Sequence, residues 1–179
     1  MADWPTKRAW VDYAFDQLAA AGYSVSSAYT MVKNPEKVTF SYRDNLWMGS
    51  DLLATGIASF GHVSGVHYQN LPEWNDYVRP LLEQGRLPLG RAMTPSPHQL
   101  LVREMILQLK RGYLNAHYFK KKFSTDILDE WGRQWKAYAD DGLLTVDGDR
   151  IELTRAGLLR VDALLPAFFE PQHQGVRYT

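Results

Sequence analysis

The spacing of apolar residues predicts that the chain begins with an amphipathic helix. Trp10, Ala14 and Leu18 recur every fourth residue within residues 5–21, so they share one face of such a helix. Gly22 follows and is typical of a helix end. We therefore expect a helix over this segment, with these three residues on its apolar side.

Three later segments have strand-like composition. Residues 23–30 and 38–42 are predicted as short strands, with a polar turn at residues 33–37 between them. The apolar run 51–59 is bounded by glycines and favours a fully buried strand of a parallel sheet, although a buried helix gives the same pattern. A helix followed by short buried strands is typical of the end of an α/β barrel.

The chain changes character near Asn70. This residue is a plausible N-cap, with proline and glutamate in the first turn after it, and predicts a helix that reaches about Glu83. A connection rich in proline and glycine follows at residues 85–97. We place the domain boundary within residues 85–95.

The C-terminal segment has the clearest helix and turn signals. Ser96 to Gln99 match a capping box with proline at the first helical position. The Asp-Gly pair at residues 147–148 lies between alternating apolar runs and predicts a β-hairpin. The expected elements are helices at 96–112, 115–123 and 124–142, a hairpin at 143–153 and a helix at 154–166. Three helices, a hairpin and a helix describe a winged-helix-like module.

Composition and charge narrow the classes of function. The chain has 179 residues, 20 basic against 20 acidic side chains and no cysteine. The absence of cysteine excludes disulfides, cysteine-based zinc sites, a cysteine nucleophile and a cysteine-ligated iron–sulfur cluster. No apolar run approaches the ~18 residues of a membrane span. The N-terminus lacks the apolar region of a signal peptide, and we therefore expect a cytoplasmic protein without a membrane partner.

Neither nucleic acid nor a metal ion is an expected partner. The third C-terminal helix, which enters the major groove in winged-helix proteins, carries five acidic side chains against two basic ones and would be repelled by phosphates. His62 and His67 lie five residues apart, but no acidic residue stands at a ligating spacing beside them. A contact of these histidines with a haem or porphyrin stays open.

Residues 51–94 carry a resemblance to a known family. They read DLLATGIASFGHVSGVHYQN and then LPEWNDYVRPLLEQGRLPLGRAMT. This stretch, together with the Leu-Thr-x-x-Gly-Leu-Leu stretch at residues 153–159, resembles the oxygen-independent coproporphyrinogen III oxidase family of radical SAM enzymes over about residues 7–165. The residues that fit the family pattern are Asp51, Leu52, Leu53, Gly56, Gln69, Asn70, Tyr77, Gly85, Pro88, Arg91 and Thr94.

The resemblance implies an α+β chain: the remnant of a radical SAM α/β partial barrel followed by a mostly helical, winged-helix-like C-terminal domain. The implied segments are the end of the barrel at 1–68, a helix and linker at 69–94, the winged-helix-like domain at 95–166 and a tail at 167–179. In that family a C-x3-C-x2-C motif holds a [4Fe–4S] cluster that reductively cleaves S-adenosylmethionine to a 5′-deoxyadenosyl radical. This chain has no cysteine and cannot ligate the cluster. Its implied partner is an N-terminal radical SAM barrel, which is either missing from a fragment or a separate chain.

The resemblance also implies residues that contact cofactor and substrate, and none that is catalytic or binds a metal. Arginine matches propionate carboxylates through a bidentate fork. The implied residues are Phe40, Gly56 and Phe60 toward S-adenosylmethionine, and Arg43, His62, His67 and Arg91 toward a tetrapyrrole.

Three functions remain open at this point. The first is the C-terminal cap of a radical SAM tetrapyrrole enzyme, which covers the barrel mouth and is inactive alone. The second is a stand-alone porphyrin- or haem-binding module. The third is a winged-helix interaction module without a small ligand.

Overall fold

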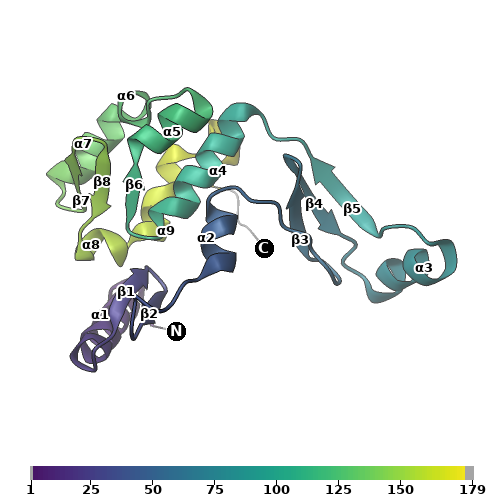
Figure 1. Cartoon of the computed structure of the whole chain (residues 1–179), viewed down its shortest axis with the longest axis horizontal. Coiled ribbons are helices and arrows are strands. Elements are labelled where there is room, and N and C mark those ends of the chain that lie inside the picture. The colour runs from purple at the N-terminus through teal and green to yellow at the C-terminus, as the bar shows by residue number, and fades with distance from the viewer. Residues whose placement is uncertain (1, 176–179) are drawn as a thin grey trace. The chain divides into compact units, whose positions relative to one another are not determined.

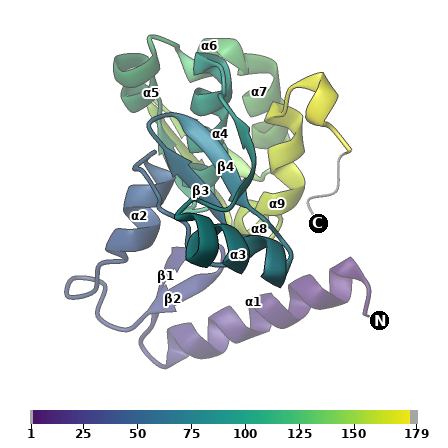
Figure 2. The same cartoon turned by 90° about the vertical axis from the view of Figure 1, so that its right-hand side faces the viewer.

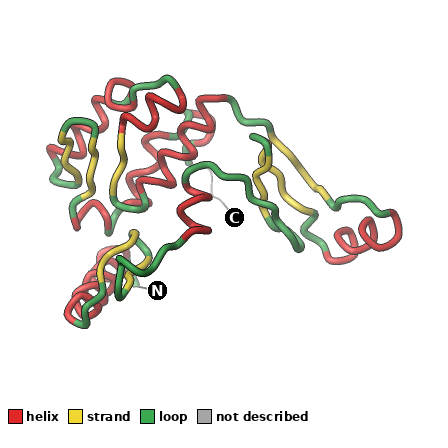
Figure 3. The backbone as a smooth tube through the Cα atoms, viewed as in Figure 1, coloured by secondary structure: helices red, strands yellow, loops and turns green. Residues whose placement is uncertain are grey.

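The computed structural model describes residues 2–175 and shows a chain of mixed α and β structure (Figure 1, Figure 3). The chain divides into two compact units, one formed by residues 1–40 with 101–179 and the other by residues 41–100. No helix among residues 2–175 is both long and apolar enough to cross a membrane.

The first unit holds the N-terminal helix, a small hairpin and the helical C-terminal segment. Its elements are α1 (Trp4–Ala20), β1 (Ser24–Ser27), β2 (Thr30–Val32), most of α4 (Pro97–Leu109), β6 (Tyr113–Asn115), α5 (Ala116–Phe123), α6 (Ile127–Glu130), α7 (Gly132–Asp140), β7 (Leu144–Asp147), β8 (Arg150–Leu153), α8 (Arg155–Leu158), α9 (Val161–Leu164) and the 3₁₀ turns η1 (Leu165–Phe168) and η2 (Pro171–His173). The second unit holds α2 (Ser41–Trp47), β3 (Phe60–Val63), β4 (Val66–Asn70), α3 (Trp74–Gln84) and β5 (Leu89–Met93).

The predicted N-terminal helix is confirmed as α1, but the face that it buries is different. The carboxylate of Asp3 accepts a hydrogen bond from the Thr6 amide at 2.8 Å and caps the helix. Phe15 is the residue that enters the core, whereas Trp10 is 61% exposed and Leu18 is also exposed. The repeat at every fourth residue therefore marks an uncovered apolar surface rather than a packed face.

Charged side chains attach α1 to the C-terminal segment. The Arg155 guanidinium lies 4.8 Å from the Phe15 ring and forms ion pairs with Asp12 and Asp16 at 2.6 and 3.1 Å. The β1–β2 hairpin lies beside the helix in both views (Figure 1, Figure 2) and is joined to α4 by a bond from the Ala28 amide to the Lys110 carbonyl oxygen.

The C-terminal segment follows its local signals closely. The capping box is confirmed: the Ser96 amide donates to the Gln99 side chain at 2.9 Å, and the Gln99 amide donates to the Ser96 hydroxyl at 3.1 Å. The Asn115 side chain caps α5 in the same way, accepting a hydrogen bond from the Tyr118 amide. The hairpin is confirmed as β7 and β8, and β6 pairs with β8 to form the three-stranded order β6-β8-β7.

The predicted helix at 124–142 is divided into two helices, α6 and α7, which Trp131 separates. Asp126 caps the start of α6. The Trp135 indole enters the core and donates to the Ile127 carbonyl oxygen at 2.7 Å. Phe168 is 2% exposed, and its ring centroid lies 4.6 Å from that of Trp135. The chain beyond residue 166, which has no strong sequence pattern, thus completes the core.

Four predictions for residues 38–97 are wrong. Residues 38–42 form no strand, because the segment passes directly into α2. Residues 51–59 form no buried strand: Leu53 is 79% exposed, and the segment makes one isolated bridge, from Leu52 to His62. The other two errors concern residues 70 and 85–97. The predicted helix to about Glu83 is confirmed as α3, which ends at Gln84, but it starts at Trp74, and Asn70 ends β4 instead of capping the helix. The predicted connection contains β5.

The second unit is organised by the antiparallel sheet β3-β4-β5. Among residues 2–175 every pair of named strands is antiparallel. The winged-helix assignment, the barrel remnant and the segment boundaries at 68, 94 and 166 stay predictions.

Candidate functional site

The register of β3-β4-β5 gathers four of the predicted site residues on one face. Phe60 pairs with Gln69, His62 with His67, and Gln69 with Arg91 across the three strands. Residues two apart along a strand, and residues paired across strands, point to the same side of a sheet. Phe60, His62, His67 and Arg91 therefore share one face, which we call the ring face, together with Gln69 and Met93.

Aromatic rings form the centre of the ring face. The Phe60 and His67 rings are stacked, with centroids 5.7 Å apart and planes 11° apart. The His62 ring lies 6.3 Å from that of His67. Phe60 is 48% exposed, whereas His62 is buried. The ring face thus presents the half-exposed Phe60 ring, which stacks on His67, and the His67 ring lies beside the buried His62 ring.

Arg91 is held at the edge of this face through Gln69. Its Nε donates to Gln69 Oε1 at 2.7 Å, and Gln69 Nε2 donates to the Ala58 carbonyl oxygen at 3.0 Å. Among residues 2–175 the side chain of Arg91 makes only this hydrogen bond to Gln69, through Nε. Its two Nη groups are therefore available to an anion. The arrangement can position a bidentate cation beside the aromatic rings.

The loop of residues 53–59 is fixed by side chains from β4 and α3. The Tyr68 hydroxyl accepts from the Ala54 amide at 2.9 Å, and the Tyr77 hydroxyl accepts from the Gly56 amide at 2.9 Å. The Asn70 side-chain amide donates to the Gly56 carbonyl oxygen at 3.0 Å and to that of Ala54 at 3.3 Å. Gly56 has φ of 99°, a conformation that favours glycine. Its backbone groups are therefore committed to holding the loop.

The opposite side of the sheet is packed too closely to bind a ligand at Gly61. A β-carbon there would overlap the Tyr68 ring. Tyr68 thus covers the sheet on that side while its hydroxyl anchors the loop. Tyr68 is not among the predicted site residues, and Asn70 anchors the loop instead of capping a helix; both stand in the same Tyr-Gln-Asn stretch as Gln69.

The other predicted site residues are not brought to the ring face by the described contacts. The Arg43 side chain pairs with neighbouring Asp44 at 2.8 Å and lies 5.3 Å from the Trp47 ring, all on α2. Phe40 belongs to the first unit and lies outside any strand. No contact tests the expected roles of Phe40, Gly56, Phe60, Arg43, His62, His67 or Arg91, which stay predictions.

The basic cluster on α5 is occupied by ion pairs. Lys122 donates to the buried carboxylate of Glu104 at 2.7 Å, and the Tyr118 hydroxyl donates to the same carboxylate at 2.7 Å. Burial and this hydrogen bond raise the pKa of Tyr118. Lys120 pairs with Asp126 at 3.1 Å. Two of the three lysines therefore stabilise the fold. Residues 2–175 contain no cluster of three or more His, Asp or Glu side chains that could hold a metal ion.

Comparison with known proteins shows which proteins the chain is similar to. Residues 96–160 match the family described as HemN C-terminal domain. The chain is 23% identical over 167 residues to the oxygen-independent coproporphyrinogen III oxidase of Pseudomonas aeruginosa strain PAO1, covering 86% of this chain and 36% of the relative. The enzyme of the same name from Helicobacter pylori strain J99 is 28% identical over 109 residues, covering 59% of this chain and 24% of the relative. The chain thus spans about a quarter to a third of the curated relatives that it matches.

A solved structure has a similar fold. The coproporphyrinogen III oxidase (HemN) of Escherichia coli, described as a radical SAM enzyme, superposes with a TM-score of 0.70 and 20% identity over 88% of this chain and 39% of that one. The fold, the family match and the curated relatives agree in one conclusion: this chain resembles the C-terminal part of the oxygen-independent coproporphyrinogen III oxidases, and its residues 96–160 match the HemN C-terminal domain family.

Proposed function

We propose that the chain works as the C-terminal part of a coproporphyrinogen III oxidase-like radical SAM protein. In this role it covers the mouth of a cluster-bearing barrel and helps to position S-adenosylmethionine and a tetrapyrrole substrate. It is not catalytic alone. The observation that carries the proposal is the ring face, which combines a half-exposed aromatic ring with a positioned arginine in a chain that resembles these enzymes.

The residues of this chain do not fit an iron–sulfur cluster. Such clusters are held by cysteine thiolates, and the chain has no cysteine. Residues 2–175 also lack any group of three or more other side chains that could hold a metal ion. The cluster therefore belongs to the partner barrel, and no step of the chemistry is assigned to residues of this chain.

A flat tetrapyrrole fits the ring face in two respects. Aromatic rings prefer offset or edge contacts with other π-systems, and the Phe60 side chain, which stacks on His67, is 48% exposed. The Arg91 guanidinium matches the geometry of a propionate carboxylate. The ring of Phe60 would bind the macrocycle or an adenine, and Arg91 would fix the orientation through one carboxylate.

The loop of residues 53–59 contributes rigidity. Its backbone groups are held by Tyr68, Asn70 and Tyr77, so the segment that leads into Phe60 is fixed before any ligand binds. A fixed loop lowers the entropy lost on binding, because fewer backbone conformers are frozen. In this proposal Asn70 and Tyr77, which fit the family pattern, act by holding the loop and not by contacting the ligand.

A coproporphyrin III titration of the purified chain, followed by Soret absorbance, tests the proposal. We expect saturable binding that Arg91→Gln weakens about tenfold, equivalent to ~1.4 kcal/mol. The matched control is Arg79→Gln on α3, whose exposed ion pair with Glu83 at 4.0 Å lies outside the ring face and whose loss should leave the affinity unchanged. Absence of saturable binding, or equal affinities for both variants, would contradict the proposed role.

A parallel titration with haemin tests the stand-alone alternative. Haemin and coproporphyrin share the macrocycle, but haemin adds an iron that a histidine can ligate. The proposed function predicts that His67→Ala weakens both ligands to a similar extent, through loss of ring support. A Soret shift with haemin alone, abolished by His67→Ala, would instead favour a haem-binding module.

A further inference from the structure

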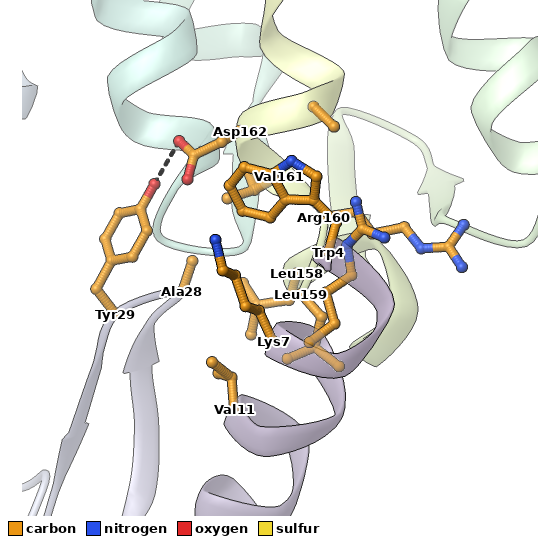
Figure 4. Close-up of a pocket in the computed structure, with 12 residues that line it drawn as sticks. Trp4, Lys7, Val11, Ala28, Tyr29, Leu158, Leu159, Arg160, Val161 and Asp162 are labelled. Carbon is orange, nitrogen blue, oxygen red and sulfur yellow. Dashed lines mark hydrogen bonds between the residues drawn. The ribbon is translucent and has the colours of Figure 1, made fainter. Parts of the chain in front are cut away.

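A second candidate binding site lies within the first unit, where no sequence pattern pointed. A pocket of about 560 Å³ opens between α1, the β1–β2 turn and the segment 158–163 (Figure 4). Small-molecule sites in proteins commonly have volumes of ~300–1,000 Å³ and mostly apolar walls with a few polar groups. This pocket has both properties, since Val11, Ala28, Leu158 and Val161 line it beside charged groups.

Three cationic side chains line the pocket. Lys7 and Arg8 come from α1, and Arg160 comes from the start of α9. Lys7 lies 4.8 Å from the Trp4 ring and extends between Trp4 and Tyr29 (Figure 4). Trp4, Lys7 and Arg8 are spaced three and four residues apart, so they share one side of the helix.

The acidic group in the pocket is already compensated. Asp162 accepts a hydrogen bond from the Tyr29 hydroxyl at 2.6 Å (Figure 4) and pairs with Lys110 at 3.5 Å. Burial and this carboxylate raise the pKa of Tyr29, so the phenol keeps its proton and remains a donor. The lining therefore carries an excess of positive charge.

Arg8 and Arg160 have no acidic partner among the described residues, unlike the neighbouring cations Lys110 and Arg155. Lys110 and Arg155 each have an acidic partner, Asp162 for the former and Asp12 for the latter. Among residues 2–175, no hydrogen bond or ion pair joins the guanidinium of Arg8 or Arg160 to another residue. Arg8 is half-buried as a residue and lines the pocket with Arg160, so both guanidinium groups are available to an anion that enters it.

We propose that this pocket binds an organic anion that carries a planar ring. The ring packs on the Trp4 indole and the apolar wall formed by Leu158 and Val161. The carboxylate or phosphate of the ligand is bound by Arg8 and Arg160. A porphyrin carboxylate and a nucleotide share this chemistry, and the inference does not depend on the ring face of the second unit.

A matched pair of small ligands tests the charge requirement. Naphthalene-2-carboxylate and the neutral naphthalene-2-carboxamide have nearly the same shape, and each is titrated into the full chain with calorimetry and amide NMR. We expect the carboxylate to bind at least tenfold more tightly than the amide. Its chemical-shift changes should fall on residues 158–162 and the Trp4 indole N–H. Equal affinities, or shifts confined to residues 60–70, would overturn the proposal.

Variants locate the site within the pocket. Arg8→Gln and Arg160→Gln should each weaken the carboxylate about tenfold, because each removes one charge-assisted hydrogen bond. Arg133→Gln, which removes an exposed arginine of α7 outside the pocket, should leave the affinity unchanged. If both pocket variants bind as the wild type does, the proposal is wrong.

Competition then distinguishes the two sources of ligand. Coproporphyrin III and adenosine 5′-monophosphate are added separately to the complex with naphthalene-2-carboxylate. Displacement by either one, with the same sensitivity to Arg8→Gln, supports the site and identifies its ligand class. Failure of both to displace the probe at millimolar concentration would contradict both members of the proposed class.

Discussion

The side-chain amide of Asn70 donates a hydrogen bond to the carbonyl oxygen of Gly56 at 3.0 Å. Asn70 is buried at the end of β4, and Gly56 lies at the tip of the loop that precedes β3. The loop has little regular structure of its own, so side chains from the strand satisfy its backbone. Asn70, one of the residues that fit the family pattern, therefore supports the loop.

Replacing Asn70 by alanine should loosen that loop. The change leaves the carbonyl oxygens of Ala54 and Gly56 without their donor, at a cost of about 1–3 kcal/mol in the free energy of unfolding. Urea unfolding measures the loss, and hydrogen exchange should show faster exchange at the Gly56 amide. Asn45→Ala, an exposed asparagine on α2, is the control and should change the free energy by less than ~0.5 kcal/mol. Equal effects of the two substitutions would contradict the anchoring role.

Replacing Gly157 by alanine should destabilise the C-terminal segment. A β-carbon at Gly157 would overlap the Leu143 carbonyl oxygen, where α8 packs against the hairpin. Because backbone must move to make room, we expect a loss of about 1–3 kcal/mol or more in thermal or urea unfolding. Gly132→Ala is the matched control, since nothing lies within 4 Å of a β-carbon there. A neutral Gly157→Ala variant would show that the close approach is not as tight as described.

Replacing Glu104 by glutamine should cost far more than removing an exposed acid. Glu104 is 5% exposed and accepts from Tyr118 and Lys122, both at 2.7 Å. Breaking a buried pair from one side typically costs about 3–5 kcal/mol, and we expect the lower end because Lys122 is partly exposed. Asp140→Asn, which breaks the exposed pair with Lys136, should cost less than ~1 kcal/mol. A double-mutant cycle of Glu104→Gln with Lys122→Met should show coupling, and additive effects would argue against the pair.

Stability should fall at alkaline pH. Burial raises the pKa values of Tyr29, Tyr118 and Tyr138 in the folded chain above the value of about 10 in the unfolded chain. The folded state then binds protons more tightly, so the contribution is fully present below pH ~10 and is lost as pH rises above it. Urea unfolding at pH 9 and pH 11 should give a lower free energy at the higher pH, with a smaller difference for Tyr138→Phe. The same free energy at both values would refute this account of the tyrosines.

The elements that sequence predicted well are those whose signals are local. The Ser96–Gln99 capping box and the hairpin around Gly148 depend on side chains and turn residues within a few positions of each other. The run 51–59 failed for the opposite reason. Its apolar composition matches a buried strand, but its backbone partners are Tyr68, Asn70 and Tyr77, which sequence spacing alone does not place.

The candidate site shows the same division. The family resemblance selected Phe60, His62, His67 and Arg91, but their shared face depends on the pairing of β4 with β5 across a helix. Such non-local register cannot be deduced from spacing in one strand. The pocket beside Trp4 is lined by residues 4–29 and 158–163, which lie far apart in the sequence. No pattern within one segment could therefore predict it.

The most direct test of the central claim joins this chain to a barrel that carries the cluster. The Pseudomonas aeruginosa relative is truncated before its matching C-terminal region and fused there to this chain, and oxidation of coproporphyrinogen III is measured anaerobically with S-adenosylmethionine. We predict that the truncated relative and this chain are each inactive alone, that the fusion oxidises the substrate, and that Arg91→Gln in the fusion raises KM. A folded fusion with a complete cluster and bound S-adenosylmethionine that oxidises no coproporphyrinogen III would contradict the proposal that this chain completes such an enzyme.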